Sequence, residues 1–292
     1  MSIRTPAVAG TFYPASVPDV HAALDQAFAA ASQVAASHVV ESAREQPSAL
    51  KEMRDLVGNP GVKALIVPHA GWIFSGSTAA NAFRLLEGRL GIERVVILGP
   101  AHRVWVPGLA MSSHSAWTTP LGNIRVHYPQ ELQALPFVET NDSTHAHEHS
   151  IEVLVPFIQR MLGDVTITPI VVGGAGRKQV AQALDAVWGG PETLIVISTD
   201  LSHYLDYAHA IEADRETTAA ILQLRSTIRS DRACGAYPLN GMMMAAKQRG
   251  MNIRLLASCN SGDTAGDLDS VVGYAAFALT DARGDDEAGG YS

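Results

Sequence analysis

Histidines follow three apolar, β-branched segments of the chain, close to the points where predicted strands end. His69 lies two residues beyond the first such segment, His102 lies four beyond the second, and His203 lies five beyond the third. Asp200 stands between His203 and its segment. Imidazole binds transition metals and titrates near neutral pH, so converging histidines suit a metal site or acid–base catalysis. One histidine after a strand is more often a capping or packing residue, but three at one edge favour a site.

The elements that must position these histidines alternate between strands and helices. The predicted strands cover residues 63–67, 94–98, 109–112, 123–126, 166–172, 193–198, 252–257 and 270–279. Helices are predicted over residues 17–31, 177–187, 207–224 and 240–249, with two more ending near residues 90 and 162. This order favours a parallel sheet with right-handed crossovers. Because the carboxyl ends of parallel strands line the ligand crevice, the three histidines should meet there.

We expect one α/β domain over residues 1–280, with a mostly parallel central sheet flanked by helices. The chain has 292 residues, of which 47% are hydrophobic and 17% charged, and this is ordinary for a globular protein with a substantial core. The polar segment 32–60 is interpreted as a helical or mobile excursion rather than a domain boundary. Residues 281–292 are rich in Gly and Asp and are expected to form a disordered tail.

The composition of the chain argues against some classes of binding partner. The net charge is −8 and no run of Lys or Arg occurs, which argues against nucleic-acid binding. No apolar stretch approaches the roughly 18 residues of a membrane span. Only two cysteines occur, so a reducing compartment fits best and we expect a cytoplasmic protein. The size and class are compatible with a homodimer.

A second group of histidines lies between residues 145 and 149, just before a helical pattern. Glu148 and His149 fall at the start of that helix, where the helix dipole favours a carboxylate, so Glu148 is either a capping residue or part of the site. For His149 the two interpretations, lining the site or not, are equally supported. His145 and His147 are expected to be exposed to solvent, and the remaining histidines, such as His114, are treated as background.

Other side chains near these positions have two interpretations each. Trp72, Phe74 and Tyr204 flank the histidines and could wall an apolar substrate pocket or belong to the core. Cys259 could be a soft metal ligand, but both Cys259 and Cys234 are interpreted as buried structural thiols.

The segment 261–267 resembles a phosphate-binding or turn loop but lacks the spacing and the Lys of a P-loop. Asp263 and Asp267 could supply a carboxylate ligand, although turn aspartates are equally common.

Six motifs, together with Ala9-Gly-Thr-Phe-Tyr13, occur in the order found in one known family. They are Pro68-His-Ala-Gly71, Gly99-Pro-Ala-His102, Thr118-Thr-Pro-Leu121, Glu148-His-Ser-Ile-Glu152, Ser198-Thr-Asp-Leu-Ser-His203 and Val272-Gly-Tyr-Ala-Ala276. On these motifs the chain resembles the Memo family, whose bacterial and archaeal members are called AmmeMemoRadiSam system protein B. The resemblance covers about residues 5–280.

The resemblance implies a fold similar to that of the class III extradiol dioxygenases, which use non-haem Fe(II). His69 and His102 match the two histidine ligands, and His203 matches the acid–base histidine, with Asp200 and His149 beside them. In animal Memo proteins the third ligand is a cysteine, which we place in the loop before the last strand.

Counting back from the motif at 273–276, that position is Thr264 in this chain, and the neighbouring Asp263 is the expected substitute. The resemblance therefore implies His69, His102 and Asp263 as the metal ligands.

Two functions from different classes follow from this resemblance. The first is a non-haem iron oxygenase or related redox enzyme that acts on a small molecule, with Asp200 and His203 as catalytic residues and Trp72, Glu148 and His149 against the substrate. The second is a non-catalytic module that binds a peptide or protein on the same fold. A zinc hydrolase is a third interpretation, and copper is a further alternative ion. The family name also implies two companions, a radical-SAM enzyme and an AMMECR1-domain protein.

Overall fold

A twelve-stranded sheet runs through the molecule, of which the computed structural model describes residues 2–43 and 56–281. The strands are β1 (Ile3–Arg4), β2 (Val62–Val67), β3 (Arg94–Pro100), β4 (Leu109–Met111), β5 (Ala116–Thr119), β6 (Gly122–Val126), β7 (Val138–Thr140), β8 (Thr166–Val172), β9 (Thr193–Ser198), β10 (His203–Leu205), β11 (Asn252–Asn260) and β12 (Val271–Thr280). Their order along the sheet is β1-β5-β6-β8-β3-β9-β2-β12-β10, with β11 paired to β12 and β4 paired to both β7 and β8.

The five central strands are parallel. Each neighbouring pair in the series β6, β8, β3, β9 and β2 runs in the same direction. Antiparallel pairs flank this centre, with β5 beside β6 on one side and β12 beside β2 on the other. The carboxyl ends of β2, β3 and β9 consequently lie together, as the sequence predicted.

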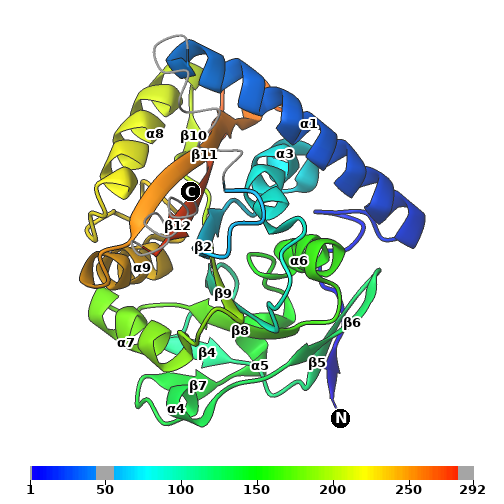
Figure 1. Ribbon diagram of the computed structural model, residues 1–292, viewed down its shortest axis with the longest axis vertical. Coiled ribbons are helices and arrows are strands. Elements are labelled where there is room, and N and C mark those ends of the chain that lie inside the picture. The colour runs from blue at the N-terminus through cyan, green and yellow to red at the C-terminus, as the bar shows by residue number, and fades with distance from the viewer. Residues whose placement is uncertain (1, 44–55, 282–292) are drawn as a thin grey trace, which may run out of the picture.

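Helices cover both faces of the sheet (Figure 1). The longer ones are α1 (Val17–Ala43), α3 (Trp72–Phe83), α6 (Val155–Leu162), α7 (Arg177–Val187), α8 (Tyr207–Leu222) and α9 (Ala236–Gln248). The short ones are α4 (Gln130–Gln133), α5 (Asp142–Ala146) and the 3-10 turns η1 (Arg84–Leu86), η2 (Glu152–Leu154) and η3 (Ser261–Asp263).

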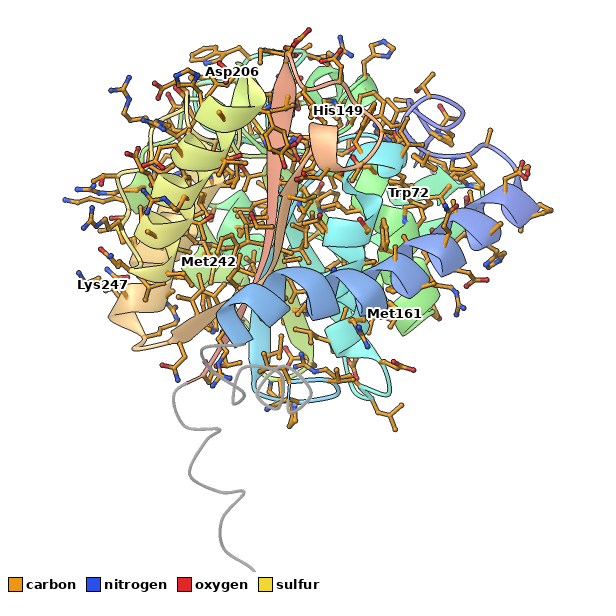
Figure 2. All side chains as sticks on the ribbon, turned by 90° about the horizontal axis from the view of Figure 1, so that it is seen from above. Trp72, His149, Met161, Asp206, Met242 and Lys247 are labelled. Atoms are coloured by element: carbon orange, nitrogen blue, oxygen red, sulfur yellow. The ribbon has the colours of Figure 1, made fainter. Side chains whose placement is uncertain are left out.

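Side chains that alternate between the two faces of the central strands explain why helices cover the sheet on both sides. In β2, Leu65 and Val67 pack into one buried cluster with residues of α1, α3 and α6. Ala64 and Ile66 pack into a second cluster with residues of α7, α8 and α9. Successive strand side chains point to opposite faces, so a strand that is apolar throughout must be covered on both sides. Figure 2 shows the two layers from another side, with Met242 of α9 in one of them and α1 along the other.

The predicted fold class is confirmed, and most of the predicted long elements lie within a few residues of their observed bounds. Helix α1 is longer than predicted, because it continues past residue 31 to Ala43. The short strands β1, β5, β7 and β10 were not predicted. The segment 44–55 and the predicted disordered tail, apart from Asp281, lie outside the described residues.

Within the described part of the chain, no helix has both the length and the apolar character needed to cross a bilayer.

Candidate metal centre

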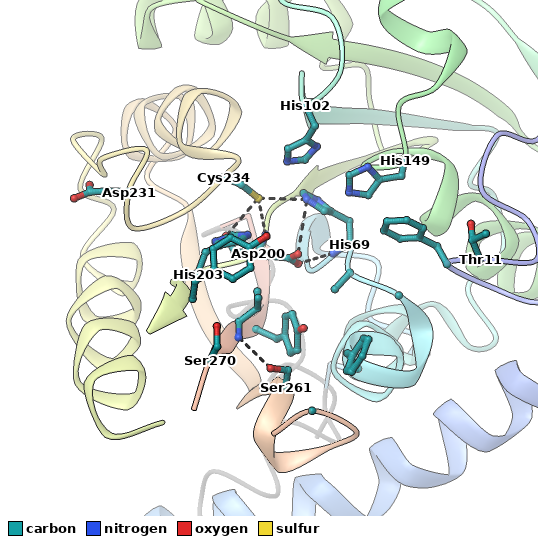
Figure 3. A pocket seen from close by; sticks show the side chains of 18 of the residues that line it. Thr11, His69, His102, His149, Asp200, His203, Asp231, Cys234, Ser261 and Ser270 are labelled. Carbon is teal, nitrogen blue, oxygen red and sulfur yellow. Dashed lines mark hydrogen bonds and ion pairs between the residues drawn. The ribbon is translucent and has the colours of Figure 1, made fainter. Parts of the chain in front are cut away.

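A cavity of about 890 Å³ opens at the carboxyl ends of β2, β3 and β9. Figure 3 shows the side chains that line it. Its polar wall includes His69, His102, His149, Asp200, His203 and Cys234. The sequence had placed four of these six at the site, left His149 open and interpreted Cys234 as a structural thiol.

Three imidazoles converge at the base of this cavity. One ligand atom from each of His69, His102 and His149 lies within 4.8 Å of the other two. Their ring centroids are 4.7–5.4 Å apart, and the three rings lie close together in Figure 3. Because these residues come from three distant segments of the chain, the arrangement requires the tertiary fold.

The hydrogen bonds of His69 fix its ring proton on Nδ1. Ser198 Oγ donates its only proton to the carbonyl oxygen of Ser150, at 2.5 Å. The same Oγ lies 2.6 Å from His69 Nδ1, so it must accept from an Nδ1–H group. Burial, followed by the charges of the neighbouring histidines, lowers the pKa of His69 well below its usual range. His69 is therefore neutral, with an Nε2 lone pair toward the cavity, as a metal ligand requires.

Glu148 positions His102 from behind. Its carboxylate accepts from His102 Nδ1 at 2.9 Å and from the backbone N–H of His102 at 2.6 Å. It also accepts from the backbone N–H groups of His149 and Ser150. Burial opposes ionisation of Glu148, but the hydrogen bonds from His102 and Ser150 outweigh it and hold its pKa at about 2. Such carboxylate–histidine pairs orient metal ligands and raise their basicity.

His149 has an unused buried nitrogen. Its Nδ1 is buried, lies 3.4 Å from Glu148 Oε1 and makes no hydrogen bond, while its ring packs 4.5 Å from that of Phe12. Burial lowers the pKa of His149 to about 4, so the imidazole is neutral at physiological pH. A buried polar atom without a partner is costly unless something else satisfies it.

A carboxylate and a thiol approach His69 from the other side. Cys234 Sγ lies 3.3 Å from His69 Nε2, and Asp200 Oδ2 lies 3.9 Å from the same nitrogen. Asp200 Oδ1 accepts from the backbone N–H of His69 at 2.7 Å, and burial raises the pKa of Asp200 to about 7. Burial and the charge of Asp200 also raise the pKa of the Cys234 thiol. His69, Asp200 and Cys234 form a second group of potential ligands that shares His69 with the first.

A glycine brings Cys234 to this position. Gly235 packs so closely on the end of β9 that a Cβ there would lie 2.5 Å from the carbonyl oxygen of Ser198. Its N–H donates to Thr199 Oγ1 at 2.9 Å, and Asp200 N–H donates to Cys234 Sγ at 3.2 Å. The loop before α9 is thereby fixed against the strand that carries Asp200.

A second glycine fixes the segment that carries His203. Gly273 exchanges backbone hydrogen bonds with Leu201 and Ser202, and its missing Cβ leaves room for the buried Asp214 carboxyl group. That carboxyl group accepts from the N–H of Ser202 at 2.9 Å. His203 Nδ1 donates to the carbonyl oxygen of Leu201 at 2.8 Å, so its Nε2 carries the lone pair.

Asp263, the expected third ligand, lies elsewhere. Its carboxylate accepts from the N–H of Asn260 at 2.8 Å and from the hydroxyl of Tyr207 at 2.6 Å, which stabilises the loop after β11. Thr264 donates to the carbonyl oxygen of Ser261 in the same loop. Among the described residues neither group of potential ligands contains Asp263. The structure corrects this expectation and offers Cys234 as the donor beside His69.

Two residues expected against the substrate lie behind the cavity. Trp72 is 9% exposed, donates from Nε1 to the carbonyl oxygen of Val153, and packs against Tyr13 and Phe157 in the core. Neither Trp72 nor Glu148 lines the cavity. Trp72 begins α3 on the side that faces the apolar layer, which explains its burial.

The expectation for His145 was wrong, since its side chain is 1% exposed and its Nε2 donates to the carbonyl oxygen of Ala110. His147 is exposed, as predicted.

The donors at the cavity base fit a transition metal. Imidazole nitrogens and a thiolate sulfur are the ligands that zinc, iron and copper take in proteins. His69 and His149 are neutral, Ser198 and Glu148 orient His69 and His102, and the buried Nδ1 of His149 makes no hydrogen bond. A bound cation would also favour the thiolate form of Cys234 and release its proton.

Comparison with known proteins identifies the family of this chain. The family model described as Memo-like protein matches residues 4–278. The chain is 32% identical to a MEMO1 family protein of Ignicoccus hospitalis, over 94% of this chain and 98% of that protein. A MEMO1 family protein of Methanosarcina acetivorans is 32% identical over 95% and 99% of the two chains, and one of Aquifex aeolicus is 31% identical over 94% and 98%. This chain belongs to the Memo-like family.

Proposed function

We propose that this protein is a metal-dependent enzyme of the non-haem iron oxygenase or related redox class, acting on a small molecule in the cavity. One observation carries the proposal: His69, His102 and His149 converge at the base of a cavity whose wall also holds a fourth imidazole, His203. In a cluster that served only to stabilise the fold, the imidazole nitrogens would not be expected to converge on a cavity of this size.

The metal would be held by His69 and His102, with Cys234 or His149 as the next donor. When bound, Fe(II) would supply one-electron redox chemistry and open coordination positions. Zinc and copper are the alternative ions, because the same donors also bind them.

His203 would take the proton of a phenol or enol group on the substrate. Its Nδ1–H group is fixed on the carbonyl oxygen of Leu201, so Nε2 is the nitrogen that accepts. Burial lowers the pKa of His203, which keeps this nitrogen unprotonated at neutral pH. A general base of this kind contributes about 10²- to 10⁴-fold to a rate.

Asp200 would support the same proton transfer. Its carboxyl group is 4% exposed and lies on the cavity wall, and burial raises its pKa to about 7. A group with this pKa can both take up and release a proton at physiological pH. Its hydrogen bond from the N–H of His69 also fixes the backbone that carries that imidazole.

Anaerobic titration of the purified protein with Fe(II), followed by O2-uptake measurements against a series of catechols, tests the proposal. We expect about one ion per chain and O2 uptake that depends on His203. Metal analysis of the protein as purified distinguishes iron from zinc and copper. A chain that binds no metal and consumes no O2 would contradict the proposal and favour the peptide-binding alternative.

A further inference from the structure

The cavity wall carries a cation that the proposed chemistry does not use. Arg103 follows His102 directly and lines the cavity with the four histidines. Within the described residues, its guanidinium group makes no hydrogen bond and has no carboxylate within ion-pair distance. Among the described residues that line the cavity, there is no other Arg and no Lys.

The carboxylates on the same wall are already engaged. Asp231 forms two hydrogen bonds with the guanidinium group of Arg229, at 2.9 and 2.8 Å. Asp267 accepts from two backbone N–H groups of its own turn, at 3.1 and 3.2 Å. Asp200 accepts from the N–H of His69 at 2.7 Å. Each acidic group on the wall has a partner, whereas Arg103 forms no ion pair with a carboxylate of the described residues, although the chain carries a net charge of −8.

Aromatic side chains form part of the remaining wall. Phe12, Phe74, Tyr204 and Tyr274 line the same cavity. A cavity of about 890 Å³ has room for a molecule of drug size, and aromatic side chains commonly line sites that bind such molecules.

We propose that the cavity selects an organic anion, whose carboxylate or phosphate group is held by Arg103 while its apolar body lies against the aromatic wall. The inference rests on the proposed function, since it names the class of substrate for that site. A guanidinium group offers paired donors that match the two oxygens of either anion. Arg103 is then a specificity residue that binds the anionic group of the substrate beside the metal site.

Calorimetric titration of the full-length protein with four simple probes tests this inference. Benzoate and phenyl phosphate carry both ring and charge, acetate carries the charge alone, and benzyl alcohol carries the ring alone. The titrations use protein freed of metal with a chelator, because a bound cation would itself attract anions. We expect benzoate or phenyl phosphate to bind at least about tenfold more tightly than benzyl alcohol or acetate.

Variants of Arg103 test whether this residue binds the anionic group of the probes. Arg103→Ala should weaken binding of the anionic ring probes about tenfold, and Arg103→Lys should restore part of it. The matched control is Arg94→Ala, because Arg94 starts the same strand, β3, at its opposite end and has no ion-pair partner among the described residues. This variant should bind the probes as the parent does.

The inference is overturned if no probe binds, if the anions bind no more tightly than benzyl alcohol, or if Arg103→Ala equals the parent. The difference between benzoate and phenyl phosphate assigns the anion as carboxylate or phosphate. Metal content is measured separately on each variant. Loss of the metal proposal therefore leaves the anion result readable, and loss of the anion result leaves the metal proposal intact.

Discussion

Two clusters in this molecule combine histidine with carboxylate and hydroxyl groups, and they differ in where their nitrogens point. In the cavity, His69, His102 and His149 come from three distant segments and direct ligand atoms to within 4.8 Å of one another. In the second cluster, beside β4, a single imidazole, His114, lies near Asp142 with its Nδ1 at 3.2 Å from Oδ1.

The second cluster is a local network that satisfies itself. Ser112 Oγ lies 2.8 Å from His114 Nδ1 and donates to Asp142 at 2.9 Å, and Ser113 donates to the same carboxylate. Burial opposes ionisation of Asp142, but the hydrogen bonds from Ser113 and Ser112 hold its pKa at about 2. The comparison teaches that convergence of free lone pairs, rather than the presence of histidine with polar partners, marks a candidate metal centre.

Removing a histidine from each cluster should give the largest contrast. His69→Ala or His102→Ala should lower metal affinity by more than the roughly 100-fold that loss of an outer-shell partner costs, because a ligand itself is removed. His114→Ala should leave metal affinity unchanged. Competition with a chromophoric chelator measures all three variants. Equal loss in His114→Ala would erase the distinction between the clusters.

The two cysteines provide a second comparison, between a residue that lines the cavity and one that does not. Cys234 lies at His69 Nε2, whereas the half-buried Cys259 contacts Thr78 Oγ1 at 3.0 Å. We expect Cys234→Ser to lower metal affinity by on the order of 100-fold and Cys259→Ser to leave it unchanged.

Asp263→Asn tests the ligand expected from the sequence. Because the Asp263 carboxylate is used within its own loop, this variant should bind metal as the parent does. A metal loss in Asp263→Asn that exceeded the loss in Cys234→Ser would restore Asp263 as the third ligand.

Glu148→Gln should have an intermediate effect. The amide keeps the shape of the side chain but removes the negative charge that pairs with His102 Nδ1. Metal affinity should fall about 10- to 100-fold while the fold is retained. Glu192→Gln is the matched control, since Glu192 is partly buried and precedes β9, at the end of that strand opposite the cavity. An unchanged metal affinity in Glu148→Gln would show that this carboxylate serves only to cap the backbone of its loop.

The smallest expected effect concerns stability against pH. Burial lowers the pKa of His145 to about 4, compared with about 6.5 in the unfolded chain. Between these values the unfolded state binds the proton and the folded state does not, so the stabilisation from His145 is lost as pH falls from about 6.5 to about 4. His145→Gln should therefore show a shallower fall in the free energy of unfolding over this range, measured by urea denaturation. An identical slope in the parent and the variant would contradict the assignment.

The sequence was sufficient to place His69, His102, Asp200 and His203 at one edge, because each follows a strand whose apolar pattern is unambiguous. The parallel arrangement of those strands then brings the four residues together, because it places the carboxyl ends of the strands side by side.

Cys234 was not predictable in this way. It precedes a helix, and it reaches the cavity only because Gly235 packs against the end of β9. The Cys-Gly pair was the one available signal, since a glycine allows close approach of backbone segments. Trp72 was misplaced for a related reason. Its neighbour in sequence, Gly71, lines the cavity, while the first turn of α3 directs the indole ring into the core.

Anomalous scattering from a crystal grown anaerobically with Fe(II) tests the central claim most directly. The account predicts one strong peak at the base of the cavity, bonded to the imidazoles of His69 and His102, with Cys234 or His149 as a further ligand. A peak bound elsewhere, or a cavity without one under conditions where solution titration shows binding, would contradict it.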